Sequence, residues 1–253
     1  MWEDVFTVIS NLAFLLPFAL AVELERIFVA FVYLFQMIDS AAYHTCNSFS
    51  GICFGLSPLF WRHSDFFWAQ FIPVFSVLNL IRFPSKPRAW IWVRPTIWVL
   101  SGVLIFMLQR WIGESTWLQF GIVGGSFIGL LLYWAIYAWN AWMRDRDQES
   151  LLPPYRWNNL TLGLALSALA SSLYVTEMQN HNMYWAIHSV WHVLAALGQY
   201  FLLKAWHRED FKDYSTAVLA RPIAAASRVL PAAFMTRRTR PIKLRHVTPK
   251  SRV

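Results

Sequence analysis

Seven apolar runs, each near the length that spans a lipid bilayer, constrain this chain more than any other feature of its sequence. They cover residues 5–22, 27–46, 65–81, 89–108, 116–142, 157–175 and 183–206. An α-helix rises 1.5 Å per residue, so about 20 apolar residues cross the hydrocarbon core. Backbone groups find no water there, which favours helices that satisfy their own hydrogen bonds. The runs therefore predict an all-α integral membrane protein, a bundle of seven transmembrane helices.

The composition agrees with this prediction. Charged residues make up only 14% of the chain, whereas a soluble domain carries nearly twice that fraction. The first run is preceded by Glu3 and Asp4 rather than by basic residues, so we expect a retained helix and not a signal peptide. The fifth run carries small residues that we expect to let neighbouring helices approach closely, namely Gly121, Gly124, Gly125 and Gly129.

Lysine and arginine favour cytoplasmic loops, and their distribution predicts the orientation. With seven spans, twenty of the 22 lie on the side that holds the loops after the first, third and fifth helices and the C-terminal segment. The other side has Arg62 and Arg110 only. The N-terminus is therefore predicted outside and the C-terminus in the cytoplasm.

The sequence divides into a seven-helix membrane domain, residues 1–207, and a basic tail, residues 208–253. We expect the tail to be mostly disordered and to rest against anionic lipids of the cytoplasmic leaflet. A solvated tail that only fixes the topology explains the same charges. No segment resembles a nucleic-acid-binding module, so the net charge of +8 predicts no nucleic-acid partner. An oligomer is compatible with the sequence.

Ionisable residues inside a membrane are costly and therefore indicate function. His188 and His192 lie four residues apart, on one face of the seventh helix. Two imidazoles at this spacing can bind one metal ion, as in other helical zinc sites. The alternative is a pair of hydrogen-bonded or interfacial histidines.

The second helix offers a third imidazole, His44, with Ser40 one turn before it on the same face. Three protein ligands and an open position are typical of catalytic zinc. Ser40 would then hydrogen-bond the bound water or a substrate carbonyl, or alternatively a carbonyl of its own helix.

Asp65 is predicted at the start of the third helix. A carboxylate there could take a proton from a zinc-bound water, or it could be an ordinary acid that the helix dipole favours. The predicted orientation places His44, Asp65 and the histidines of the seventh helix at the same non-cytoplasmic level.

Other polar residues leave alternatives open. Asp39 is turned about 140° away from His44 and could pair with another helix. Cys46 and Cys53 lie on the non-cytoplasmic side, where either a disulfide or two free thiols is allowed.

The pattern of Ser-x-x-x-His, Asp and His-x-x-x-His on these three helices resembles the signature of the CREST superfamily, which includes alkaline ceramidases and the progestin and adipoQ receptors. The local sequence is most similar to its myomaker and transmembrane-protein-8 branch. The segments that carry this similarity are Ser10-Asn11-Leu12-Ala13-Phe14-Leu15, Tyr43-His44-Thr45-Cys46, Arg62-His63-Ser64-Asp65 and Tyr184-Trp185-Ala186-Ile187-His188-Ser189-Val190-Trp191-His192. The resemblance covers about residues 5–205. It implies that His44, His188 and His192 bind Zn²⁺ and that Asp65 and Ser40 lie beside a metal-bound water.

Two functions from different classes follow. The first is a zinc-dependent membrane hydrolase that cleaves a lipid ester or amide bond at the non-cytoplasmic side, with Asp65 as base and then acid and Ser40 holding the oxyanion. By resemblance its substrates are ceramide-like amides, phospholipids or the acyl chains of GPI anchors. The second is a non-enzymatic protein, either a myomaker-like fusion protein with a structural zinc or a lipid-binding receptor. A lipid-sized cavity beside the zinc would favour the hydrolase or the receptor. The plasma membrane and the secretory-pathway membranes both fit the topology.

Overall fold

The chain is helical wherever its structure is described. A computed structural model describes residues 2–49, 52–81, 90–113, 115–144, 153–179 and 183–205, and within these ranges it contains no strand. All of these residues belong to one compact unit, Met1–Tyr214, whereas the second unit, Ser215–Val253, lies outside the described residues. The predicted all-α class is confirmed for the described part, and the predicted tail at 208–253 falls outside it.

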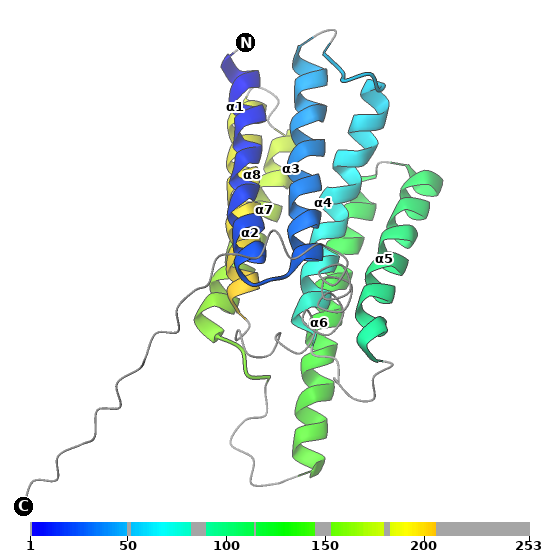
Figure 1. The fold of residues 1–253 in the computed structure, drawn as a ribbon, viewed down its shortest axis with the longest axis vertical. Coiled ribbons are helices and arrows are strands. Elements are labelled where there is room, and N and C mark those ends of the chain that lie inside the picture. Colours follow the sequence, from blue (N-terminus) through cyan, green and yellow to red (C-terminus); the bar gives the residue numbers. More distant parts are fainter. Residues whose placement is uncertain are drawn as a thin grey trace, which may run out of the picture. The chain divides into compact units, whose positions relative to one another are not determined.

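The helices follow one another along the described ranges with short connections. In order they are α1 (Trp2–Ser10), η1 (Asn11–Phe14), α2 (Leu15–Glu23), α3 (Ile27–Ser48), α4 (Pro58–Leu80), α5 (Trp90–Ile112), α6 (Thr116–Arg144), α7 (Trp157–Gln179) and α8 (Tyr184–Lys204). The segments α1, η1 and α2 are continuous, so the first apolar run is one helical rod that tightens into a 3-10 turn. The long segments run in alternating directions (Figure 1). The end of α3 and the starts of α1, α4 and α8 therefore lie at one end of the bundle.

Five segments are long and apolar enough to cross a membrane: Glu3–Glu23, Ile27–Ser48, Val93–Ile112, Trp117–Asn140 and Tyr184–Lys204. α4 and α7 have 23 residues each, which is enough to span, but their polar residues make them less hydropathic. The described residues thus form a multi-span helical bundle, and the count of seven spans stays a prediction.

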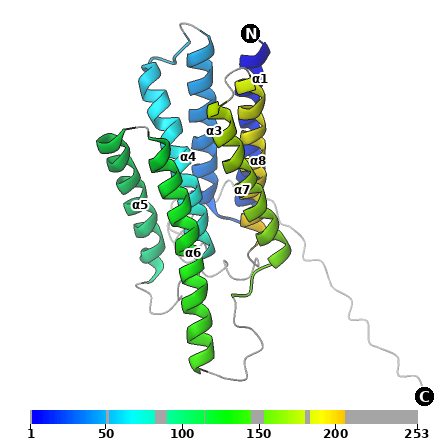
Figure 2. The same cartoon turned by 180° about the vertical axis from the view of Figure 1, so that it is seen from behind.

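The bundle is built around α3, α4 and α8. The rod α1–η1–α2 packs between α3 and α8, and α7 packs along α8. On the other side, α4 packs against α3 and carries both α5 and α6, which lie on the outside in both views (Figures 1 and 2). α6 and α7 are not among the helix pairs with extensive contact in the described part of the chain.

Close helix approach occurs at glycines other than those expected. A Cβ atom built at Gly163 of α7 would lie 2.9 Å from the backbone nitrogen of Leu202 in α8, and one at Gly198 would lie 2.6 Å from Ser167 Oγ. The α7–α8 pair therefore needs both glycines. The expectation for α6 is wrong, because Cβ atoms at its four glycines would meet nothing within 4 Å.

Two arginines are buried at the end of the bundle opposite the start of α1. Arg26 precedes α3 and is 8% exposed, and Arg94 near the start of α5 donates a hydrogen bond to the Ile81 carbonyl at 2.8 Å. Burial and the neighbouring Arg94 guanidinium lower the pKa of Arg26 to about 9. Arg26 therefore stays mostly protonated at neutral pH, and it remains a cation on the side that the sequence analysis predicts to be cytoplasmic.

Candidate metal centre

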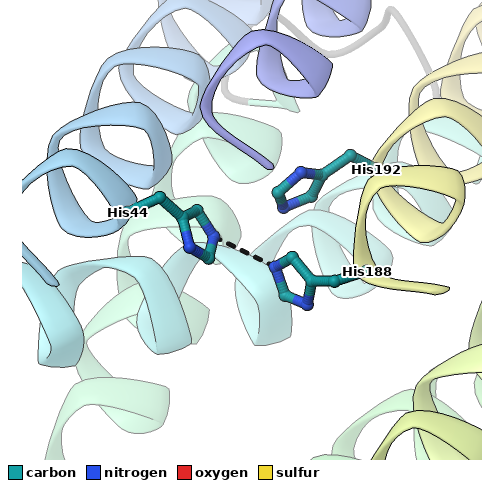
Figure 3. A group of neighbouring side chains, drawn as sticks. All are labelled: His44, His188 and His192. Carbon is teal, nitrogen blue, oxygen red and sulfur yellow. Dashed lines mark hydrogen bonds between the residues drawn. The ribbon is translucent and has the colours of Figure 1, made fainter. Parts of the chain in front are cut away.

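Three histidines from two distant parts of the sequence meet inside the bundle. His188 and His192 project from the same face of α8, one turn apart, and His44 approaches them from the last turns of α3 (Figure 3). Their exposed fractions are 5%, 0% and 2% respectively. Sequence reasoning predicted all three, and the fold brings them together.

The imidazole nitrogens face a common point. Nε2 of His44 and Nε2 of His188 are 3.0 Å apart, and one ligand atom from each of the three rings lies within 4.8 Å of the others. Tetrahedral zinc with bonds of about 2.0–2.1 Å places its ligand nitrogens about 3.3 Å apart. Imidazole also suits Zn²⁺ as a ligand. The His44–His188 separation is close to that value, and the three rings could hold a metal ion if their nitrogens moved together from separations of up to 4.8 Å.

Ser10 fixes the orientation of the His192 ring. Its Oγ donates to the Thr7 carbonyl at 2.7 Å and lies 2.8 Å from His192 Nδ1. Because the single hydroxyl proton is used toward Thr7, Oγ accepts the Nδ1–H of His192, which leaves the Nε2 lone pair for a metal. Second-sphere hydrogen bonds of this kind are usual for ligating histidines.

Sequence reasoning did not assign a role to Ser10. It lies at the end of α1, where the helix tightens into η1, and the next residue, Asn11, is fully buried. Asn11 donates its side-chain amide to the Thr7 and Val8 carbonyls. A Ser-Asn pair inside an apolar run was the available signal, since such polar residues are rarely placed there without a partner.

Ser40 also reaches the cluster. It is fully buried, and its Oγ lies 3.5 Å from His192 Nε2. This contact is at the outer limit of a hydrogen bond, so Ser40 is close to the histidines but only weakly held by them. Its position one turn before His44 follows from the helical spacing that the sequence predicted.

Asp65 is buried, and it lies further inside its helix than the sequence predicted. The structure gives it an exposed fraction of 6%. The predicted helix start at Asp65 is wrong: α4 begins at Pro58, and Ser57 caps it by accepting the Phe60 N–H at 3.1 Å. Asp65 is thus two turns inside the helix, beyond the first turn where the dipole favours an acid. The alternative that Asp65 is an ordinary acid at a helix N-terminus is therefore wrong.

Asp39 joins α3 to α4 at the same level. Its Oδ2 accepts hydrogen bonds from Ser64 Oγ and Trp68 Nε1, both at 2.5 Å. We call this group of Asp39, Ser64 and Trp68 the polar clamp. Two of its residues adjoin predicted functional residues in the sequence, because Ser40 follows Asp39 and Asp65 follows Ser64. The clamp therefore sets the register of the two helices that carry Ser40 and Asp65.

A disulfide closes the connection between these helices. Cys46 and Cys53 are bonded, which resolves the alternatives that the sequence left open. Cys46 lies two residues after His44, and Trp61 of α4 donates its indole N–H to the Cys53 carbonyl at 2.9 Å. The bridge and this hydrogen bond tie the end of α3 to the start of α4 beside the histidines.

A largely apolar cavity of about 110 Å³ begins next to the cluster. It lies among α4, α6, α7 and α8, and residues of η1 and α3 complete its wall. Two of its lining residues contact His192. The centroid of the Phe14 ring lies 6.4 Å from the centroid of the His192 ring, and that of Trp191 lies 4.9 Å from it. The histidine cluster and the cavity therefore share a wall.

A multi-span helical bundle with a buried three-histidine cluster is the class of protein that these features define. The chain belongs to the DUF3522 family, described as "Protein of unknown function", whose family model matches residues 1–193.

Two kinds of curated relative are similar to most of this chain. Human transmembrane protein 8B is 26% identical over 205 residues, which are 80% of this chain and 41% of that protein. Mouse post-GPI attachment to proteins factor 6 is 24% identical over 201 residues, which are 77% of this chain and 24% of that protein. The chain thus spans about two fifths and about a quarter of these relatives. Together with the apolar helices, the similarity identifies a multi-pass membrane protein.

Proposed function

We propose that this protein is a zinc-dependent membrane hydrolase that acts on an ester or amide bond of a lipid at the non-cytoplasmic side. The observation that carries the proposal is the convergence of three buried histidines beside an apolar cavity. Three imidazoles leave one position of a tetrahedral metal open. The cavity, whose lining residues Phe14 and Trp191 contact the His192 ring, would offer a place for part of an apolar chain near the histidines.

His44, His188 and His192 would hold the zinc ion. Bound there, zinc supplies a Lewis acid for a carbonyl oxygen and a water that is nucleophilic at neutral pH. The chain's own residues supply the rest. Ser10 keeps the His192 ring in the ligating tautomer, and Ser40 donates a hydrogen bond to the oxygen on which negative charge develops. Asp65 accepts the proton of the attacking water and returns it to the leaving group.

The substrate class follows from the cavity and from the relatives. The cavity is largely apolar and offers contact to part of an acyl chain, the rest of which would extend beyond it into the lipid. One relative is named as a factor that acts after GPI attachment to proteins. We therefore place the acyl chains of GPI anchors first among the candidate substrates, before other phospholipids and ceramide-like amides.

The proposal includes a topology of seven spans with the N-terminus outside, in which α4 and α7 also cross the membrane. The Cys46–Cys53 disulfide supports this orientation, because disulfides persist in oxidising compartments. The order of Ser40, His44, Asp65, His188 and His192 supports membership of the CREST superfamily.

Metal content is the first test. We expect about one zinc per chain in the detergent-purified protein, and a loss of this zinc in His188→Ala and in His192→Ala. His63→Ala is the matched control, since His63 is half-buried on α4 and outside the cluster. A folded wild-type protein without metal would sink the proposal.

Turnover is the second test. The zinc-loaded protein is incubated with a GPI-anchored protein, a phospholipid and a ceramide, and the released fatty acid is measured. We expect release from at least one substrate, and its loss in Asp65→Asn with the zinc retained. Zinc without any release would instead indicate a structural ion that joins α3 to α8, as in a non-enzymatic fusion or lipid-binding protein.

A further inference from the structure

The cavity beside the histidines is not apolar throughout. Gln36 of α3, Ser76 of α4 and Gln199 of α8 line it, and their exposed fractions are 1%, 5% and 5%. Gln36 is eight residues from His44 and Gln199 is seven from His192. At 1.5 Å per residue this places the polar group about 10–12 Å along the bundle from the histidines. The polar group therefore lies in the interior of the cavity and not at its metal end.

The carboxamide oxygen of Gln199 already has hydrogen-bond partners within the protein. Gln199 Oε1 accepts a hydrogen bond from Tyr33 Oη at 3.3 Å and lies against Ser76 Oγ, whose single proton is shared between Gln199 Oε1 and the Ile72 carbonyl. These contacts position the carboxamide. They leave the Nε2 hydrogens of Gln199 as donors on a side chain that faces the cavity.

Gln36 carries a hydrogen-bond acceptor, whereas Gln199 offers donors. Its Oε1 is buried and accepts no hydrogen bond from any described residue. Ser167 Oγ of α7, which also lines the cavity, is likewise buried without a partner in the described ranges. A buried polar group without a partner costs about 1–3 kcal/mol, and bilayer lipid offers it no water. The residues that line the cavity thus include a donor, the Gln199 amide, and two with buried oxygens, Gln36 and Ser167, that have no partner among the described residues.

We propose that this group is a polar subsite for a hydroxyl on the apolar part of a lipid ligand. The hydroxyl donates to Gln36 Oε1 and accepts from the Gln199 amide, while the flanking chain contacts the apolar wall. The cavity therefore selects hydroxylated chains over plain ones of equal length. The inference deepens the proposed function, because it assigns a specificity element to the cavity beside the histidines.

Binding tests the subsite without any turnover. The full chain in lipid nanodiscs is loaded with a fluorescent fatty acid, which is displaced by stearic acid or by a hydroxystearic acid with its hydroxyl at mid-chain. We expect the hydroxylated acid to bind about five- to tenfold more tightly, as one additional net hydrogen bond predicts. The variant Gln36→Met, of similar volume, is expected to lose this preference and to bind stearic acid at least as well as the wild type.

The matched control is Gln70→Met. Gln70 on α4 is fully buried with its amide unpartnered by the described residues, but it does not line the cavity. This variant should keep the preference. Equal affinity of the two acids for the wild type, or an unchanged preference in Gln36→Met, overturns the subsite. A preference that depends on Gln36 in a protein without zinc or hydrolysis supports the subsite and rejects only the proposed reaction.

Discussion

At the scale of single residues, the bond between Ser10 and His192 decides what the histidine cluster can bind. An imidazole ligates a metal only through a nitrogen that carries no proton. The 2.8 Å contact to Ser10 Oγ assigns the proton of His192 to Nδ1 and so reserves Nε2. The metal affinity should depend on this serine although it touches no metal.

Replacing Ser10 by alanine should therefore weaken zinc binding without removing it. We expect a loss of about ten- to hundredfold in affinity, the usual effect of deleting a second-sphere partner, measured by competition with a calibrated chelator. Ser189→Ala is the control, because the Ser189 hydroxyl donates to its own helix at Trp185. An affinity equal to that of the wild type would contradict the role given to Ser10.

The sequence predicted most of these residues, and the misses have physical causes. The His-x-x-x-His and Ser-x-x-x-His spacings identify a helix face by themselves, and burial in an apolar run shows that the face is internal. The partnership of Ser10 depends on where the first helix packs, which no local spacing encodes. The apolar run alone predicts a start of α4 at Asp65, because the residues before it are more polar. The true start is marked by Ser57-Pro58, an N-cap followed by a favoured first helical residue.

At the scale of helices, α3 and α4 are joined by a polar clamp, while α7 and α8 are joined by small residues. Hydrogen bonds to a charged group contribute more than those between neutral groups. Close backbone approach contributes van der Waals contact, which drives helix association in lipid. Loss of a polar side chain should therefore weaken the α3–α4 contact, and a larger side chain at a glycine should weaken the α7–α8 contact.

Asp39→Ala should destabilise the protein by about 2 kcal/mol, since Ser64 and Trp68 lose their shared acceptor. The free energy of unfolding is measured in mild detergent. A double-mutant cycle with Ser64→Ala then isolates the clamp, and the effects of the two substitutions should not add. Additive effects would mean that the contact contributes no stability.

Gly163→Ala should separate α7 from α8 and destabilise the protein by about 1–3 kcal/mol, since the new methyl group meets the backbone of Leu202. Gly125→Ala in α6 is the control. Its methyl group meets nothing, so the higher helix propensity of alanine should leave stability equal or slightly raised. The melting temperatures of the two variants are compared by thermal unfolding. A lower melting temperature for Gly125→Ala than for Gly163→Ala would refute the close α7–α8 contact. The sequence indicated that glycines mattered, but only the packing of the helices shows which ones.

At the scale of the whole molecule, the predicted orientation in the membrane determines which side the histidine cluster would face. Lysine and arginine counts predict that the N-terminus lies outside. The bonded Cys46 and Cys53 support the same orientation independently, because Cys46 lies near the end of α3. That end of α3 is at the same end of the bundle as the start of α1 (Figure 1). In this predicted orientation the histidine cluster lies toward the outer leaflet or the lumen.

An epitope tag at the N-terminus should consequently be accessible to antibody in unpermeabilised cells or to protease added on the luminal side. A tag at the C-terminus should be accessible only after permeabilisation. A cell line that expresses each tagged chain separately provides the comparison. Accessibility of both tags from the same side would exclude an odd number of spans and with it the seven-helix topology.

The histidine cluster also has a consequence for biosynthesis. Its ligands come from α3 and α8, and the ring of His192 is oriented by α1, so the first and last described helices both contribute to it. Membrane helices emerge from the ribosome in order, N-terminal segments first. A nascent chain therefore cannot assemble the site until α8 has been inserted. Chains that end before α8 lack His188 and His192, so they would have neither the proposed metal site nor the proposed hydrolase activity.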